Sequence, residues 1–233
     1  GIKISKRSEL INQILKEKNL RLLAISGTHG KTTTTAIAIW LFVQLGIPVS
    51  YSLGSTISYG LPAHYEPGSE YFVYECDEFD RNFLDFYPSM SAISSLSYDH
   101  ADTYPNQADY DYAFTDFVKQ STKTIMWQST ADHLNMADQT QVDILSERDP
   151  SLQFIQLPGK HVRRNAWLAA QLVMRTQPAI RQSDIFEALA RFPGVSRRFE
   201  KLGENLYTDY AHHPDEIAAT LQLAHEVNKN VVV

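Results

Sequence analysis

Short apolar runs alternate with longer segments of mixed polarity along most of the chain. The apolar runs predict strands at 20–26, 47–52, 71–76, 91–97 and 123–127, with a weaker one near 152–157. Helical spacing of apolar residues lies between most of them, at 5–19, 31–45, 106–120, 161–176 and 183–191. This order predicts an α/β fold, with a mainly parallel sheet covered by helices on both faces.

Two of these helices differ in how much apolar surface they carry. In segment 5–19, Leu10, Ile11, Ile14 and Leu15 are predicted to share one face. Segment 31–45 is apolar nearly all round, which predicts a buried helix.

The pattern changes after residue 192, where turn-forming residues gather. Pro193-Gly194 ends the preceding helix and Gly203-Glu204-Asn205 is a turn signal, so we expect one domain over 1–192 and a linker over 193–204. A strand is predicted at 205–209, a helix from Pro214, and the start of a further strand at 231–233. These elements are too few for a self-sufficient domain. We therefore expect 205–233 to begin a truncated second α/β unit.

The run Gly27-Thr28-His29-Gly30-Lys31-Thr32-Thr33 joins the strand at 20–26 to the buried helix. Glycines allow backbone N–H groups to close around phosphate oxygens, and the helix N-terminus favours negative charge. In such a P-loop the lysine reaches the phosphates and the threonine hydroxyl binds Mg²⁺. The spacing is the short form, Gly-x-x-Gly-Lys-Thr, because Ile25 stands where the longer form has its first glycine. The segment predicts a nucleoside triphosphate site.

Composition narrows the class of protein only slightly. The net charge of −6 gives no general attraction to nucleic acid or to an anionic membrane. The single cysteine, Cys76, excludes an internal disulfide and is expected to lie buried in a strand. No apolar run approaches the roughly 20 residues of a membrane span, and the first residues lack the pattern of a signal peptide. We therefore expect a cytoplasmic protein with no nucleic-acid or membrane partner; its oligomeric state is not predicted.

Three further polar clusters follow predicted strands. They are Glu75-Cys76-Asp77-Glu78, Asp99-His100-Ala101-Asp102 and Asp209-Tyr210-Ala211-His212-His213-Pro214. In parallel sheets ligands bind at the carboxyl ends of the strands, and carboxylates there can hold the magnesium of a triphosphate. Taken singly, each cluster also fits a solvated turn or a helix cap.

Together with the loop, these clusters resemble the ATP-dependent Mur ligases of peptidoglycan synthesis. Three other segments add to the resemblance, namely Gly159-Lys160-His161 with Asn165-Ala166, and Phe192 to Glu200, all in the family's order. Within the family, the branch that joins L-alanine to UDP-N-acetylmuramate is the most similar. The resemblance implies ATP and Mg²⁺ as cofactors. It implies UDP-N-acetylmuramate and L-alanine as substrates.

The resemblance also implies a role for each matching residue. It assigns catalytic roles to Lys31, His100 and Arg198. It assigns the binding of magnesium to Thr32, Glu75 and His100. The residues that it implies contact the nucleotide are Gly27, Thr28, His29, Gly30, Lys31, Thr32, Thr33, His161, Asn165, Arg198, Asp209, Tyr210 and His212. Among these, His161 and Asn165 would meet the adenine, and Asp209 the ribose.

The sequence departs from the family in several places. The loop begins at residue 27, so we expect no nucleotide-sugar domain before it in this sequence, and Val162 replaces a usual asparagine. The stretch between Trp127 and Leu157 is short, and no asparagine is evident ahead of Asp99-His100. Three alternatives therefore remain open: another Mur-type ligase, such as a murein-peptide ligase or folylpolyglutamate synthetase, a non-catalytic nucleotide-binding protein, and a metabolite kinase.

Overall fold

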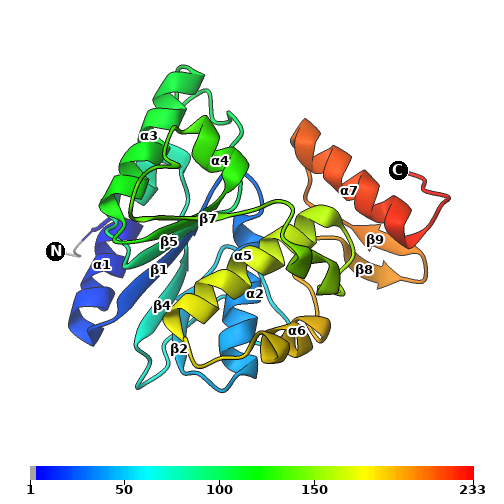
Figure 1. Ribbon diagram of the computed structural model, residues 1–233, viewed down its shortest axis with the longest axis horizontal. Helices are drawn as coiled ribbons and strands as arrows, with labels where there is room; N and C mark the ends of the chain where they lie inside the picture. Colours follow the sequence, from blue (N-terminus) through cyan, green and yellow to red (C-terminus); the bar gives the residue numbers. More distant parts are fainter. Residues whose placement is uncertain (1–3) are drawn as a thin grey trace.

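The computed structural model describes residues 4–233 as a seven-stranded sheet with helices on both faces, followed by a hairpin and a last helix (Figure 1). The strands of the main sheet are β1 (Arg21–Ser26), β2 (Val49–Ser52), β3 (Ala63–His64), β4 (Tyr71–Glu75), β5 (Met90–Ile93), β6 (Thr124–Trp127) and β7 (Val142–Leu145). The helices are α1 (Arg7–Lys18), α2 (Lys31–Gln44), α3 (Gln107–Gln120), α4 (Gln128–His133), α5 (Lys160–Thr176), α6 (Gln182–Ala190) and α7 (Pro214–Val227), with 3-10 turns η1 (Phe79–Asp85) and η2 (Pro150–Phe154). None of the helices within 4–233 is long and apolar enough to cross a bilayer.

The sheet has the strand order β3-β2-β4-β1-β5-β6-β7, and only the β2–β3 pair is antiparallel. This confirms the predicted α/β fold with a mainly parallel sheet. The first strand is central: β1 pairs with β4 on one side and β5 on the other, with Ile25 opposite both Glu75 and Ala92. The segments that follow these three strands therefore leave the same edge of the sheet side by side.

Each face of the sheet carries its own apolar core. Helices α2, α5 and α6 cover one face, and α1, α3 and α4 cover the other (Figure 1). The helix predicted to be buried, α2, packs against the sheet, α5 and α6, and its Trp40 indole donates a 2.8 Å hydrogen bond to the carbonyl of Ala188 in α6. On the opposite face Phe83 packs between Phe114 and Phe117, at ring distances of 5.0 and 4.8 Å. The two cores hold the sheet rigidly between the helices, and so fix the position of the sheet edge at which the predicted loop follows β1.

The C-terminal segment packs against the start of α5. Strands β8 (Glu200–Gly203) and β9 (Leu206–Thr208) form an antiparallel hairpin, and β8 lies inside the segment expected to be a linker. Helix α7 follows and places Leu223 in contact with α5, where its exposed fraction is only 1%. The Glu226 carboxylate accepts hydrogen bonds from the backbone N–H of Gly159 at 2.9 Å and from Arg163 at 3.0 Å. The last helix is thereby anchored close to the loop edge.

Several local predictions are wrong. The weak strand near 152–157 is absent, since Pro150–Phe154 is a 3-10 turn and the edge strand is β7 instead. Residues 231–233 form no strand and have no neighbouring strand to pair with. In α1, Leu10 is 52% exposed although Ile11 is buried, so the apolar face is narrower than its spacing indicates. Cys76 is fully buried, as predicted, but it directly follows β4 and does not lie within a strand.

Candidate nucleotide-binding site

The loop between β1 and α2 is shaped by two glycines. Gly27 and Gly30 have φ values of 129° and 84°, a region that L-residues rarely adopt. A Cβ on Gly27 would lie 2.5 Å from the Ser94 hydroxyl, and one on Gly30 would lie 2.7 Å from the Asn165 amide. Both positions therefore require glycine, for backbone conformation and for space.

The loop delivers an open helix N-terminus. Helix α2 begins at Lys31, directly after Gly30, which has no side chain to cap it. The N–H groups of a first helical turn have no partner within the helix and favour an anion. Thr28 holds the loop in place, because its hydroxyl donates to the Ser97 carbonyl at 2.8 Å and accepts from the Ser97 N–H at 2.9 Å. This geometry fits a phosphate group.

Lys31 lies against a buried carboxylate. Its ammonium is 2.7 Å from Oε2 of Glu78, whose side chain is fully buried, and donates to the Gly27 carbonyl at 2.8 Å. Oε1 of Glu78 lies 3.6 Å from Nε2 of His100. Hydrogen bonding to Glu78 raises the pKa of His100, although burial opposes this. The Lys31 ammonium and the His100 imidazole thus share one buried carboxylate.

A second carboxylate meets the threonine of the loop. Glu75, the last residue of β4, accepts a hydrogen bond from the Thr32 hydroxyl at 2.7 Å and another from the backbone N–H of Gly54 at 2.7 Å. A hydroxyl and a carboxylate at this distance are a suitable pair of oxygen ligands for Mg²⁺. His100 contacts Glu78 and Asp99 instead of this pair.

The structure offers a second group of cation ligands beside the first. Asp77, Glu78 and His100 each present a ligand atom within 4.8 Å of the others. The three expected magnesium ligands, Thr32, Glu75 and His100, are therefore divided between two neighbouring clusters. Carboxylates beside both Lys31 and Thr32 fit a triphosphate that carries divalent cations.

A cavity of about 480 Å³ opens beside the loop, between the start of α5 and the C-terminal segment. The expected site residues that line it are His29, Gly30, Thr33, His161, Asn165, Arg198 and Asp209. The expected residues outside its lining are Gly27, Thr28, Lys31, Thr32, Glu75, His100, Tyr210 and His212. Val162, the departure from the family pattern, lies in the cavity wall.

The far wall of this cavity is held together by Asp209. Its two carboxylate oxygens accept from the backbone N–H groups of Phe199 and Ala211, each at 2.7 Å. The guanidinium of Arg198 lies 5.3 Å from the centre of the Tyr210 ring. Burial lowers the pKa of His161, which favours a neutral imidazole at the opposite wall. His212 is exposed, and its backbone N–H donates to Glu216 at 3.3 Å.

Two residues of this site were missed by the sequence-based prediction. Glu78 lies in an acidic cluster that was recognised, but only its full burial and its 2.7 Å pairing with Lys31 separate it from the partly exposed Glu75 and Asp77. Glu216 fitted the pattern of an acid in the first turn of a helix. In the structure its ionised carboxylate accepts a hydrogen bond from Nδ1 of His29 at 3.1 Å, which links α7 to the loop.

We expect the carboxyl of Glu216 to remain ionised down to about pH 2. Burial, the largest single influence, raises its pKa, but hydrogen bonds from His29 and from the backbone of His212 outweigh it and lower the pKa to about 2. Since this folded pKa lies below the ordinary value, the ionised group stabilises the fold above about pH 4.5, and the contribution is lost as the pH falls toward 2. A carbon NMR titration of the Glu216 carboxyl measures this pKa directly. An ordinary midpoint near 4.5 would contradict the contact with His29.

A central strand, a short glycine loop and a helix that opens with lysine and threonine define a P-loop α/β protein. Carboxylates from the end of the neighbouring strand complete the pattern. The chain belongs to the Mur ligase family, because residues 25–147 match the model of the Mur ligase middle domain.

Relatives with known names agree with this assignment. The chain is 33% identical over 269 residues to the UDP-N-acetylmuramate–L-alanine ligase of Salinispora arenicola, with 97% of this chain and 51% of the relative covered. It is 34% identical over 257 residues to the enzyme of that name in Christiangramia forsetii, covering 99% of this chain and 56% of the relative. The chain thus spans about half the length of these relatives.

Solved structures show the same fold. The crystal structure of the UDP-N-acetylmuramate–alanine ligase from Thermotoga maritima superposes with a TM-score of 0.79 at 25% identity, covering 96% of this chain and 58% of that one. A murein peptide ligase from Psychrobacter arcticus superposes with a TM-score of 0.64 at 20% identity, covering 96% and 62% of the two chains. The second likeness concerns the fold alone.

Proposed function

We propose that this chain supplies the ATP-binding part of a ligase that joins L-alanine to UDP-N-acetylmuramate. The observation that carries the proposal is the loop itself, in which Lys31 and Thr32 stand at an open helix N-terminus against Glu78 and Glu75. The names of the relatives in Salinispora and Christiangramia support the choice of substrates.

The reaction would require two steps at one carboxylate. The γ-phosphoryl group of ATP moves to an oxygen of the muramate carboxylate, and ADP leaves. The amine of alanine then attacks the carbonyl carbon, phosphate leaves with that oxygen, and the nitrogen loses a proton as the amide forms. Such phosphoryl transfer needs positioning and charge neutralisation more than covalent help from the protein.

The residues of this chain are suited to positioning and neutralisation. Lys31 would exchange its contact with Glu78 for phosphate oxygens, and the N–H groups at the start of α2 would hold the phosphates. Mg²⁺, held by Thr32 and Glu75, would neutralise phosphate charge when bound. A second cation fits Glu78 and His100 in the adjoining cluster.

The cavity next to the loop would receive the nucleoside. His161 and Asn165 form the wall at the start of α5, and Arg198 and Asp209 the wall at the hairpin. Because Asp209 already accepts two backbone hydrogen bonds, it would meet the ribose with its remaining lone pairs.

Calorimetric titration of this chain with Mg·ATP and, in parallel, Mg·GTP tests the nucleotide site. We expect saturable binding that selects ATP. Absence of ATP binding would contradict the proposed site. The ligase step is tested separately with the full-length product of the gene, by measuring phosphate release that requires both UDP-N-acetylmuramate and L-alanine. ATP binding without such release would support a non-catalytic nucleotide-binding protein, and release that requires a murein tripeptide would support a murein-peptide ligase.

A further inference from the structure

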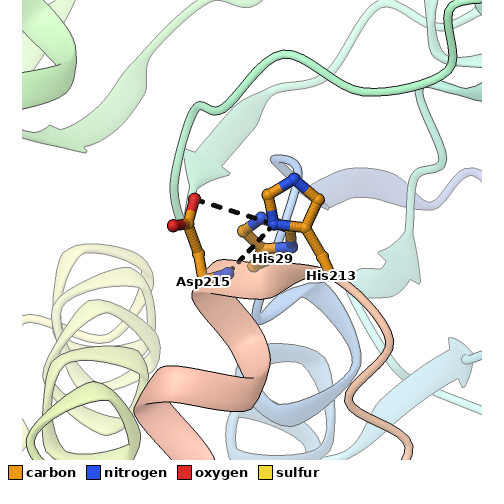
Figure 2. A group of neighbouring side chains, drawn as sticks. All are labelled: His29, His213 and Asp215. Atoms are coloured by element: carbon orange, nitrogen blue, oxygen red, sulfur yellow. Dashed lines mark hydrogen bonds and ion pairs between the residues drawn. The ribbon is translucent and has the colours of Figure 1, made fainter.

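Two imidazoles and a carboxylate meet where α7 approaches the loop (Figure 2). His29 belongs to the loop, His213 precedes the first turn of α7, and Asp215 lies within that turn. Each offers a ligand atom within 4.8 Å of the other two. The centres of the two imidazole rings are 4.7 Å apart, with the planes inclined by 41°.

A neighbouring carboxylate orients the first of these imidazoles. Glu216 lies 3.1 Å from Nδ1 of His29, which places the ring proton on that nitrogen. The other nitrogen, Nε2, is buried and has no hydrogen-bond partner among residues 4–233. Histidines that bind metals usually give their other ring N–H to a carboxylate in this way, which fixes the tautomer and leaves a lone pair for the ion.

The donor set selects a particular class of cation. Two imidazole nitrogens and one carboxylate oxygen, with a position left for water, are a common ligand set for Zn²⁺ and related transition metals. Mg²⁺ prefers oxygen ligands alone and is better served by Thr32 and Glu75. From this geometry we propose that His29, His213 and Asp215 form a binding site for a zinc-class divalent cation, which joins the loop to the start of α7.

This site is distinct from the cation positions beside Lys31, and it does not depend on the proposed ligase activity. Its ligands come from segments more than 180 residues apart in sequence, so a bound cation would hold α7 against the loop. Because His29 and Asp215 also line the nucleotide cavity, zinc and nucleotide are expected to compete.

The test is a calorimetric titration of the whole chain with Zn²⁺ in excess Mg²⁺, followed by Co²⁺ as a probe whose visible absorption reports nitrogen ligands. We expect one strong zinc site. Nδ1 of His213 caps α7 by accepting from the backbone N–H of Asp215 at 3.3 Å. His213→Asn removes the imidazole but keeps a side chain that can accept this N–H, and should weaken zinc binding by about 100-fold. Glu216→Gln should weaken it by about 10- to 100-fold through the orientation of His29. His225→Asn, on the exposed side of the same helix, is the matched control and should bind zinc as the unaltered chain does.

Three results would overturn the proposal. The first is an unaltered chain that binds no zinc at millimolar concentration. The second is equal zinc affinity in His213→Asn and in the His225→Asn control. The third is a loss of affinity in His100→Asn but not in His213→Asn, which would place zinc in the cluster with Glu78. Circular dichroism in the presence of a chelator verifies that each variant is folded. If His213→Asn is not folded, the zinc affinity of Glu216→Gln compared with that of His225→Asn decides whether the proposal holds.

Discussion

Replacing Lys31 with alanine is expected to reduce affinity for Mg·ATP by about 10- to 100-fold, because a hydrogen bond to a charged group contributes roughly 1.5–3 kcal/mol. The ammonium lies at the start of α2, where it donates to the Gly27 carbonyl of the loop. In the full-length ligase, turnover should fall further, by about 10²–10³-fold, since the lysine neutralises charge that develops during transfer. Calorimetry and phosphate release measure the two effects.

The same substitution has a second effect, on stability. It leaves the fully buried carboxylate of Glu78 without its ion-pair partner at 2.7 Å, and breaking such a pair costs about 3 kcal/mol. Urea unfolding should therefore show a lower free energy of unfolding for Lys31→Ala than for the surface control Lys119→Ala.

A double variant separates these two effects. Lys31→Ala combined with Glu78→Gln removes the unpaired charge, and should regain part of the lost stability while ATP binding stays weak. Unchanged ATP affinity in the single variant would refute the role of Lys31. Full recovery of ATP binding in the double variant would show that the single variant had acted only by unfolding the chain.

Substitution of Glu75 by glutamine is expected to weaken nucleotide binding mainly when magnesium is present. The glutamine amide keeps one oxygen that can accept from the Thr32 hydroxyl. It lacks the negative charge that favours a bound cation. Its nitrogen is a donor, so it cannot accept the hydrogen bond from the backbone N–H of Gly54. Loss of a ligand of this kind should reduce magnesium-dependent affinity by about 10- to 100-fold. ATP titrations with Mg²⁺ and with a chelator measure the two affinities.

The control for this prediction is a carboxylate that forms only a surface ion pair. Glu70 lies 2.8 Å from Arg21, with both side chains 57% exposed, so Glu70→Gln should leave both affinities unchanged. Equal losses with and without magnesium in Glu75→Gln would remove this residue from the metal site.

Local sequence was sufficient to predict the position of the loop and of most strands, because the residues that identify each of them lie close together in the chain. The glycines at 27 and 30, the lysine and the threonine are contiguous, and the buried strands are short apolar runs. Strand β7 was not recognised because Asp143, at the sheet edge, interrupts its apolar run and instead pairs with Arg175 at 2.7 Å.

The two missed site residues depend on contacts between distant segments. Glu78 is 47 positions from Lys31, and only the pairing of β1 with β4 brings them together. Glu216 is 187 positions from His29 and reaches it because α7 packs on α5. Neither distance can be obtained from residue spacing. The roles of all the candidate site residues, from the loop to Asp209, Tyr210 and His212, remain predictions.

The close approach of the loop glycines to their neighbours has a consequence for protein engineering. The space in front of Gly30 is filled by Asn165 of α5, and the space in front of Gly27 by Ser94 after β5. Loop, helix and strand end are therefore one module, and the residues at 94 and 165 belong to it as much as the glycines do. Transplanting the loop into another scaffold, or exchanging it between homologues, requires moving all three pieces together.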